Sequence, residues 1–309
     1  MRFAIIDTGT NTFHLLIVER TETGFKEIYK TQEGVKLGES GISDNVISEQ
    51  AFERGINTFK EFKHQCDIHN TTKIVAIGTA ALRNASNANE LVQKVKDETG
   101  IEMIIISGNL EAELIWNGVR HAMNLGAETS LIMDIGGGSV EFIIADENHI
   151  YWKSSFDIGG ALLLEKFKPA DPVSNDDINN LKTLFEKELK WMMQVCGIFK
   201  PVQLIGSAGS FDTFTEMIVH QFYNIDDIKN TTEYKFNLAD YNAIHQQLIT
   251  STHAQRLEMK GMLAMRADMI VVASILLNFV LRKLNFKEIK SSTYALKEGI
   301  LYKSLSILN

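Results

Sequence analysis

Cysteine and apolar runs long enough to cross a membrane are scarce in this chain. The 309 residues contain only Cys66 and Cys196, without the paired spacing of a metal site, so we expect two small core residues in a reducing cytoplasm. The apolar run Met269–Leu281 is shorter than the ~20 residues that span a bilayer, which predicts a buried helix and no membrane partner. No signal peptide is expected, because the chain opens directly into a strand-like segment.

Positive charge is also in deficit. The chain has 31 lysines and arginines against 39 acids, a net charge of −8, which argues against a nucleic-acid partner. A polyanionic substrate then needs a local basic patch, which can act because charges more than about 8 Å apart are screened at physiological salt. The length predicts about two domains.

One stretch, Leu131–Asp146, organises our interpretation. Its sequence, LIMDIGGGSVEFIIAD, places Asp134 after an apolar run, then three glycines and Ser139, and then a second apolar run that carries Glu141. This pattern predicts a strand, a tight glycine turn and a second strand, and the exposed N–H groups of such a turn can bind an anion. Carboxylates beside an anion require a cation between them, and Mg²⁺ is suited to that place. The alternative is a hairpin with a flexible turn and no ligand.

The N-terminal stretch Phe3–Glu19 repeats this pattern. Its sequence, FAIIDTGTNTFHLLIVE, aligns so that Asp7 falls on Asp134. A second motif follows each hairpin, IGTAAL in one half and IGSAGS in the other, with Gly78 71 positions after Asp7 and Gly206 72 positions after Asp134. The repeat predicts an α/β fold of two similar domains whose anion-binding turns face each other across a cleft.

Two charged residues near helix starts have alternative interpretations. Ser107 or Asn109 can cap a helix that carries Glu111 in its first turn, where the helix dipole favours an acid by roughly 0.3–1 kcal/mol. Glu111 is therefore either a helix-start carboxylate or a general base in the cleft, and Arg83 is either a surface residue or a phosphate ligand. The other expected helices are Ser48–His64, Asn89–Thr99, Ser174–Cys196, Phe211–Phe222, Leu238–Ser251, Leu257–Leu284 and 291–305.

Seven short blocks follow one another in the order of a known family. They are IIDTGTNTFHLLI at 5–17, GTAALRNASN at 78–87, ISGNLEAELIWNGV at 106–119, MDIGGGSVEF at 133–142, LIGSAGSFDTF at 204–214, RAD at 266–268 and LKEG at 296–299. The chain thereby resembles the exopolyphosphatase/guanosine pentaphosphate phosphatase (Ppx/GppA) family, within the superfamily of actin, Hsp70 chaperones and sugar kinases. The resemblance implies two duplicated ribonuclease H-like (actin-like ATPase) domains, at 1–120 and 121–293, with an interdomain cleft and a C-terminal helix of about 294–309 packed back on the first domain.

The resemblance also implies an activity. Family members are phosphoric anhydride hydrolases that remove the terminal phosphate of inorganic polyphosphate or, as the alternative, the 5′ γ-phosphate of guanosine pentaphosphate (pppGpp), with Mg²⁺ and in some cases a monovalent cation such as K⁺. An ATP-using kinase would want an aspartate as its base, and a non-catalytic sensor would be favoured by loss of Glu111 or Glu141. A cytoplasmic enzyme is expected, and a homodimer is an expectation from the family.

Site residues transfer from the family by motif. Glu111 aligns with the catalytic glutamate that activates water, and Glu141 with the second carboxylate, which positions the water or the metal. Asp7 and Asp134 look like the acids that hold Mg²⁺ through bound waters. The expected phosphate ligands are Gly9, Thr10, Asn11, Arg83, Gly136, Gly137, Gly138, Ser139, Gly206, Ser207 and Gly209.

A few positions depart from the family pattern. Leu110 precedes Glu111 where many relatives carry a second glutamate. Lys36 and Lys297 stand where relatives often carry arginine, which keeps the charge but loses the fork geometry. His14, opposite Glu141 in the internal repeat, is expected to be structural.

Overall fold

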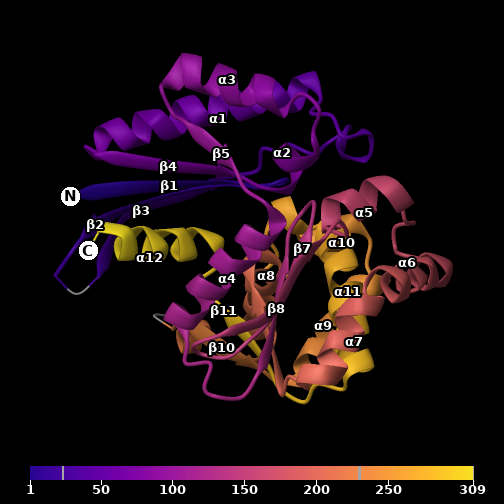
Figure 1. Cartoon of the computed structure of the whole chain (residues 1–309). Helices are drawn as coiled ribbons and strands as arrows, with labels where there is room; N and C mark the ends of the chain where they lie inside the picture. The colour runs from indigo at the N-terminus through magenta and orange to yellow at the C-terminus, as the bar shows by residue number, and fades with distance from the viewer. Residues whose placement is uncertain (23, 229–230, 309) are drawn as a thin grey trace.

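The repeat in the sequence corresponds to two β-sheets in the computed structural model, which describes residues 1–22, 24–228 and 231–308 (Figure 1). The first sheet has the strand order β3-β2-β1-β4-β5, and the second has the order β10-β11-β9-β6-β7-β8. In each sheet an antiparallel trio is continued by parallel strands, so the same design occurs twice, with one additional edge strand in the second. The strands are β1 (Arg2–Thr8), β2 (Phe13–Arg20), β3 (Phe25–Glu33), β4 (Lys73–Gly78), β5 (Met103–Ile105), β6 (Ser130–Ile135), β7 (Val140–Ala145), β8 (Ile150–Phe156), β9 (Gln203–Ser207), β10 (Glu233–Phe236) and β11 (Ile289–Ser292).

Helices connect these strands and cover the sheets. The α-helices are α1 (Glu49–Ile68), α2 (Ala80–Asn84), α3 (Ala88–Thr99), α4 (Gly108–Ala122), α5 (Gly160–Phe167), α6 (Asn175–Glu188), α7 (Lys190–Phe199), α8 (Ala208–Phe222), α9 (Leu238–Thr250), α10 (His253–Leu257), α11 (Met269–Leu284) and α12 (Leu296–Leu308). Short 3₁₀ turns occur at Ile42–Asp44, Ile225–Ile228 and Ala264–Arg266. None of the helices in the described part of the chain combines the length and apolar character needed to cross a lipid bilayer.

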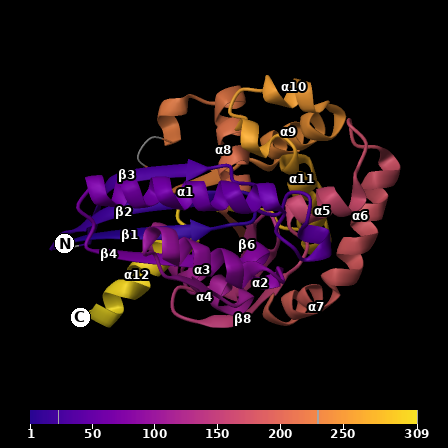
Figure 2. The same cartoon turned by 90° about the horizontal axis from the view of Figure 1, so that it is seen from above.

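The alternation of side chains along each central strand produces three apolar cores. In β1, Ala4 and Ile6 face a core shared with α1 and α3, whereas Phe3 and Ile5 face the opposite side. That opposite side is shared with α4, α12 and one face of the second sheet, so a single core joins the two halves. The other face of the second sheet packs under the helices of the second half. Figure 1 shows α12 and α4 below the first sheet and beside the second, and Figure 2 gives the same elements seen from above.

Two glycines set the contact between α4 and α12. A Cβ at Gly118 would lie 2.1 Å from the carbonyl oxygen of Ala295, and a Cβ at Gly299 would lie 1.8 Å from that of Leu114. No side chain larger than hydrogen fits at either place, so the two helices touch backbone to backbone. Asn117 Nδ2 also donates to the carbonyl oxygen of Gly299 at 2.8 Å.

Two expected helices are interrupted. The segment beginning at the capping box of Ser174 and Asp177 ends at Glu188, and α7 begins after a break at Leu189. The helical region predicted over Leu257–Leu284 is helical mainly from Met269, because α10 ends at Leu257 and α11 begins only at Met269. Gly261 between them has φ of +80°, a left-handed conformation that an α-helix does not accommodate.

The boundary between the two halves falls near α4. This helix follows the last strand of the first sheet, yet it packs against β7, β8 and α12. α12 in turn contacts α4 and β1. We propose that the first domain ends near residue 120, with the C-terminal helix returning to it.

Candidate functional site

Two glycine turns of matching construction face the cleft between the sheets. The N–H of Gly9 donates to the carbonyl oxygen of Thr12 at 3.1 Å, and the N–H of Gly136 donates to that of Ser139 at 3.0 Å. The turns also approach each other closely, since a Cβ at Gly138 would lie 2.6 Å from Oγ1 of Thr10. The internal repeat is thus a repeat of hydrogen bonding as well as of sequence.

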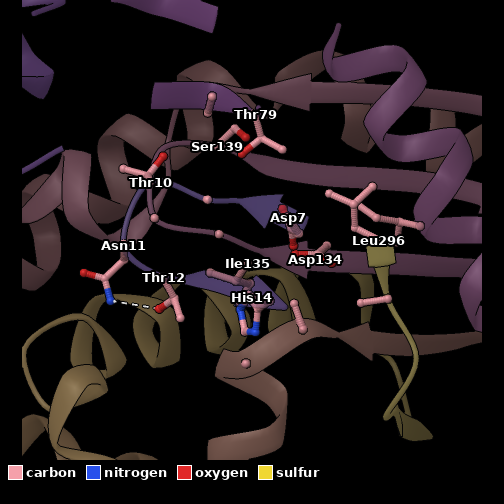
Figure 3. A pocket seen from close by; sticks show the side chains of 18 of the residues that line it. Asp7, Thr10, Asn11, Thr12, His14, Thr79, Asp134, Ile135, Ser139 and Leu296 are labelled. Carbon is pink, nitrogen blue, oxygen red and sulfur yellow. Dashed lines mark hydrogen bonds between the residues drawn. The ribbon is translucent and has the colours of Figure 1, made fainter. Parts of the chain in front are cut away.

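The turns line a cavity of about 110 Å³. Figure 3 shows Asp7 and Asp134 side by side at its floor, with Thr10, Thr79 and Ser139 nearby. The predicted residues that line the cavity are Asp7, Gly9, Thr10, Asn11, Glu111, Asp134, Gly136, Gly137, Gly138, Ser139 and Gly209. Thr12, His14, Thr79, Asp212, Arg266 and Lys297 also line it and were not among the predicted site residues. Arg83, Glu141, Gly206 and Ser207 lie outside its lining.

The two aspartates of the cavity hold their protons unusually tightly. Burial raises the pKa of Asp7 to about 6, against the opposing charge of Lys297. Burial and the neighbouring Glu141 raise the pKa of Asp134 to about 8, although a hydrogen bond from Ser207 opposes the shift. Two carboxyls that are costly to ionise in this way indicate a place where a cation would be favourable.

Glu111 lies at the start of α4 and reaches the same cavity. Ser107 caps the helix by accepting from the N–H of Leu110 at 3.2 Å, as expected. Arg83 Nη1 donates to Glu111 Oε2 at 2.9 Å and to the carbonyl oxygen of Ile106 at 3.1 Å. Burial and the charge of Glu141 raise the pKa of Glu111 well above its ordinary value, while Arg83 works in the opposite direction. A buried carboxylate with an elevated pKa is suited to accept a proton near neutral pH.

Glu141 is fixed by two hydroxyls just outside the cavity. Ser139 and Ser155 donate to its Oε1 at 2.7 and 2.6 Å. These hydrogen bonds lower its pKa, but burial outweighs them and the net shift is upward. Ser155 lies on β8, opposite Glu141 in the strand register, and no feature of the sequence pointed to it.

Several of the predicted phosphate ligands instead stabilise the fold. The N–H groups of Gly9 and Gly136 close their own turns, so only the amides that follow them are available to an anion. A Cβ at Gly206 would lie 1.8 Å from the ring of Phe211, so this glycine makes room for core packing. Gly209 makes room for a side chain of the cavity instead. A Cβ added at Gly209 would lie 1.9 Å from Nη2 of Arg266, and both residues line the cavity.

Arg266 is a cationic residue of the cavity that the residue predictions left out. Its side chain is buried, and its Nε has no hydrogen-bond partner among the residues described. Burial lowers its pKa, while Asp212 and Asp134 work in the opposite direction. An incompletely paired, buried guanidinium that lines a cavity is chemically suited to bind an anion. The RAD block at 266–268 was the signal in the sequence that could have identified it.

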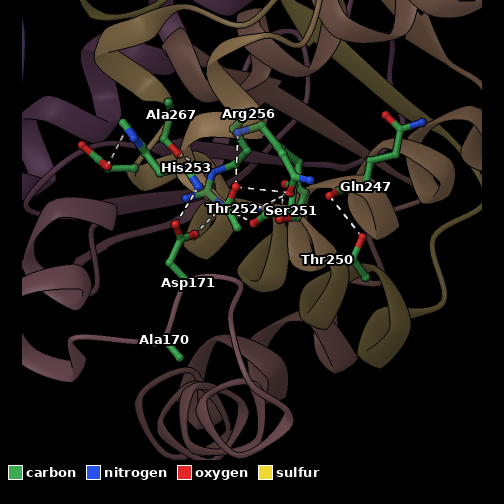
Figure 4. Close-up of polar contacts among 12 residues, drawn as sticks. Ala170, Asp171, Gln247, Thr250, Ser251, Thr252, His253, Arg256 and Ala267 are labelled. Atoms are coloured by element: carbon green, nitrogen blue, oxygen red, sulfur yellow. Dashed lines mark hydrogen bonds and ion pairs between the residues drawn. The ribbon is translucent and has the colours of Figure 1, made fainter.

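A second buried arginine holds the segment that carries Arg266 (Figure 4). Arg256 Nε donates to the carbonyl oxygen of Ala267 at 2.8 Å, and its Nη1 donates to that of Ser251 at 2.6 Å. The same Nη1 pairs with Asp171 Oδ1 at 3.0 Å. These contacts fix the backbone next to Arg266, since they attach it to α10 and to the loop after α5.

The carboxylates of the cavity indicate whether a metal ion would fit there. Among the residues described, no three carboxylate, imidazole or thiol groups are close enough together to ligate a metal directly. Burial and the charge of Glu141 nevertheless raise the pKa values of Asp7 and Asp134, and a divalent cation would offset this cost of ionisation. Mg²⁺ usually keeps several of its waters in proteins, so a hydrated ion between these aspartates fits the donor set.

Comparisons with known proteins agree with this geometry. A model of the Ppx/GppA phosphatase family matches residues 16–307. The chain is 40% identical to a crystallised exopolyphosphatase from Cytophaga hutchinsonii, with a TM-score of 0.97 over 99% of this chain and 98% of that one. It is 27% identical to a guanosine-5′-triphosphate,3′-diphosphate pyrophosphatase from Photobacterium profundum, over 98% of this chain.

The structural likenesses confirm the predicted fold class. The Aquifex aeolicus member of the Ppx/GppA family, 22% identical, superposes with a TM-score of 0.82 over 100% of this chain and 99% of that one. The architecture is that of two duplicated ribonuclease H-like, actin-like domains with a cleft between them. The chain spans 59% of the length of the Photobacterium relative.

Proposed function

The chain belongs to the Ppx/GppA phosphatase family, and on that basis we propose that it hydrolyses the terminal phosphate of inorganic polyphosphate. The observation that carries the proposal is the placement of Glu111 in the cavity between the two glycine turns, with Arg83 hydrogen-bonded to it from just outside the cavity lining. The likeness to the Cytophaga hutchinsonii exopolyphosphatase supports the same substrate. The retention of Glu111 and Glu141 argues against a non-catalytic sensor.

Glu111 is the general base of the proposed reaction. It accepts a proton from a water molecule whose oxygen attacks the terminal phosphorus in line with the bridging oxygen. The bond from phosphorus to the bridging oxygen breaks, and the products are orthophosphate and a chain shorter by one phosphate. Because Glu141 is held by Ser139 and Ser155, it is placed to orient the water and to keep the pKa of Glu111 high.

Positive groups around the cavity stabilise the transferred phosphoryl group. In phosphoryl transfer, positioning and charge neutralisation provide most of the catalysis. Arg266 and the free amides of the two turns are the proposed phosphate donors. Arg83 can contribute through Nη2, a buried atom without a hydrogen-bond partner in the described part of the chain. Lys297 contributes positive charge beside Asp7.

Mg²⁺ is the proposed cofactor, held through its waters by Asp7 and Asp134 with Glu141 near. When bound, it would neutralise charge on the substrate phosphates. The protein's own contribution is to keep the two aspartates at the ends of β1 and β6, aimed into one cavity. A reducing cytoplasm is the proposed location, supported by two free, buried cysteines.

Guanosine pentaphosphate is the second candidate substrate, favoured by the likeness to the Photobacterium pyrophosphatase. Both reactions use the same terminal phosphate and the same base, so substrate comparison decides between them. A phosphate-release assay with long polyphosphate, pppGpp and ATP at equal concentrations makes that comparison. Faster turnover of pppGpp than of polyphosphate at low concentration would replace the first candidate with the second.

The variant Glu111→Gln tests the assignment of the base. Removing the proton acceptor is expected to lower kcat about 10³-fold, with little change in fold. Glu113→Gln is the matched control, because Glu113 lies on the same helix but pairs with Lys153 and Lys303 away from the cavity. Orthophosphate release with Mg²⁺ measures both variants. Turnover of Glu111→Gln equal to that of Glu113→Gln would refute the role of Glu111.

A further inference from the structure

A second, larger cavity lies beside the first. It has a volume of about 630 Å³, against about 110 Å³ for the inner cavity. Thr10 and Asn11 line both, so the two spaces meet at the first glycine turn. Typical ligand pockets measure about 300–1,000 Å³, so the inner cavity takes the end of a substrate and leaves the rest to lie elsewhere.

Each half of the molecule contributes one lysine to the larger cavity. Lys36 lies in the loop that follows β3, and Lys168 is the C-cap residue of α5. Neither has an ion-pair partner within residues 1–22, 24–228 and 231–308. Two ammonium groups on opposite walls of an open cavity therefore keep their charge available to a ligand.

The acids of the same cavity are already engaged within the protein. Glu39 pairs with Arg54 at 2.8 Å, and Glu165 accepts from the backbone N–H of Ser43 at 3.2 Å. Asp268 lies 3.1 Å from Nε2 of His253. Each carboxylate thus has a hydrogen-bond or ion-pair partner in the protein, whereas neither lysine has an ion-pair partner among the described residues, so the two ammonium groups are the charges of this cavity that remain to contact an anion.

We propose that this outer cavity binds the distal phosphates of the substrate, with Lys36 and Lys168 as their cationic contacts. The proposal rests on the proposed function, since it assumes that the terminal phosphate lies in the inner cavity. The shared chemistry is a phosphate group several bonds from the one that is cleaved. It is supplied either by the continuing chain of a polyphosphate or by the 3′-diphosphate of pppGpp.

The double variant Lys36→Gln/Lys168→Gln tests the outer cavity with substrates of different length. KM for long-chain polyphosphate is expected to rise about tenfold, since two charge contacts to phosphate are lost, with kcat little changed. Tripolyphosphate, which is short enough to leave the outer cavity empty, is expected to keep its KM within about twofold. Lys166→Gln is the matched control, because Lys166 is an exposed lysine of α5 outside the cavity lining.

Two further arms distinguish the source of the phosphates. A rise in KM for pppGpp that is absent for GTP assigns the lysines to the 3′-diphosphate, and a rise that grows with polyphosphate length assigns them to the chain. Unchanged tripolyphosphate turnover also shows that the double variant is folded. Equal KM values for wild type and double variant with every substrate would overturn the proposal while leaving the proposed function intact.

The experiment also remains decisive if the wild-type protein releases no phosphate. That result would contradict the proposed function by itself, and equilibrium binding of long-chain polyphosphate then becomes the measurement. A dissociation constant raised about tenfold in the double variant, but not in Lys166→Gln, would still support the outer site. Equal dissociation constants for the three proteins would refute it.

Discussion

The two hairpins that face the cleft share a backbone and differ in chemistry. Asp7 and Asp134 occupy the same place in β1 and β6, but Asp7 is paired across the strands with His14, and Asp134 with Glu141. Burial, together with the charges of Lys297 and Arg266, lowers the pKa of His14 well below its ordinary value, so the imidazole is neutral. Glu141 instead adds a buried carboxyl.

The difference shows how one duplicated frame supports two roles. The hairpin of the first half presents a neutral ring near positive residues, which suits the phosphate side of the cavity. The hairpin of the second half places a carboxyl that interacts electrostatically with Glu111, which suits the water side. The two hairpins thus share one geometry and differ at the matching positions His14 and Glu141, and we infer that this difference separates their roles.

The paired variants Glu141→Gln and His14→Gln test this asymmetry most strongly. Loss of the Glu141 charge is expected to lower kcat about 100-fold, since Glu111 loses the neighbour that orients its water. His14→Gln, a neutral exchange, is expected to cost less than about tenfold. Orthophosphate release under saturating substrate measures both. Equal losses of kcat in the two variants would mean that the hairpins are chemically equivalent and would contradict the proposed asymmetry.

Gly209 aligns with Ala81 in the internal repeat, so the variant Gly209→Ala gives the second half the residue that the first half already has at this position. In the second half the new Cβ would lie 1.9 Å from Nη2 of Arg266. Displacing this guanidinium is expected to raise KM about tenfold, the value of one charged hydrogen bond. Gly197→Ala serves as control, because among the described residues a Cβ there would meet no atom within 4 Å beyond its own stretch of α7. An unchanged KM in Gly209→Ala would remove Arg266 from substrate binding.

The smallest expected difference between the two hairpins is in how Asp7 and Asp134 make folding stability depend on pH in the absence of metal. Because burial raises the pKa of Asp7 to about 6 and that of Asp134 to about 8, the native state holds protons that the unfolded chain releases near pH 4. In EDTA, stability should therefore fall with rising pH, up to about pH 6 through Asp7 and up to about pH 8 through Asp134.

Asp134→Asn and Asp7→Asn separate these contributions. Between about pH 6 and 8 only Asp134→Asn should flatten the decline, with a gain at about pH 8 on the order of 1 kcal/mol, or about 2–4 °C in Tm. Thermal unfolding in EDTA across this range measures the effect, and excess Mg²⁺ should reverse the order of wild type and Asp134→Asn. Coincident pH profiles for the two variants would show that their environments are alike.

The sequence predicted the repeated frame because glycine turns and strand alternation are local signals. The pairing of Asp7 with Asp134 across the internal repeat and the helix start at Ser174 followed from residue types alone, and Ser107 was one of two predicted caps for α4. The predicted roles of Glu111, Glu141 and the two aspartates stay predictions until the variants are made.

Features that depend on distant contacts were not accessible in this way. Ser155 reaches Glu141 only because β8 pairs with β7, and Arg266 enters the cavity only because Arg256 and Gly209 place it there. The break before α11 depends on the left-handed conformation of Gly261, which a run of apolar residues conceals. Local sequence patterns thus predict where the candidate site lies, and tertiary packing determines which other side chains reach it.

The joint core between the sheets has a consequence for synthesis. One face of β1 is covered by α12, which is synthesised long after β1 and α4. At about 5–20 residues per second, the roughly 170 residues between α4 and α12 take some 10–35 s to emerge. Throughout that interval α12 cannot cover Phe3, Ile5 and their neighbours, so a chaperone would have a defined window in which to act.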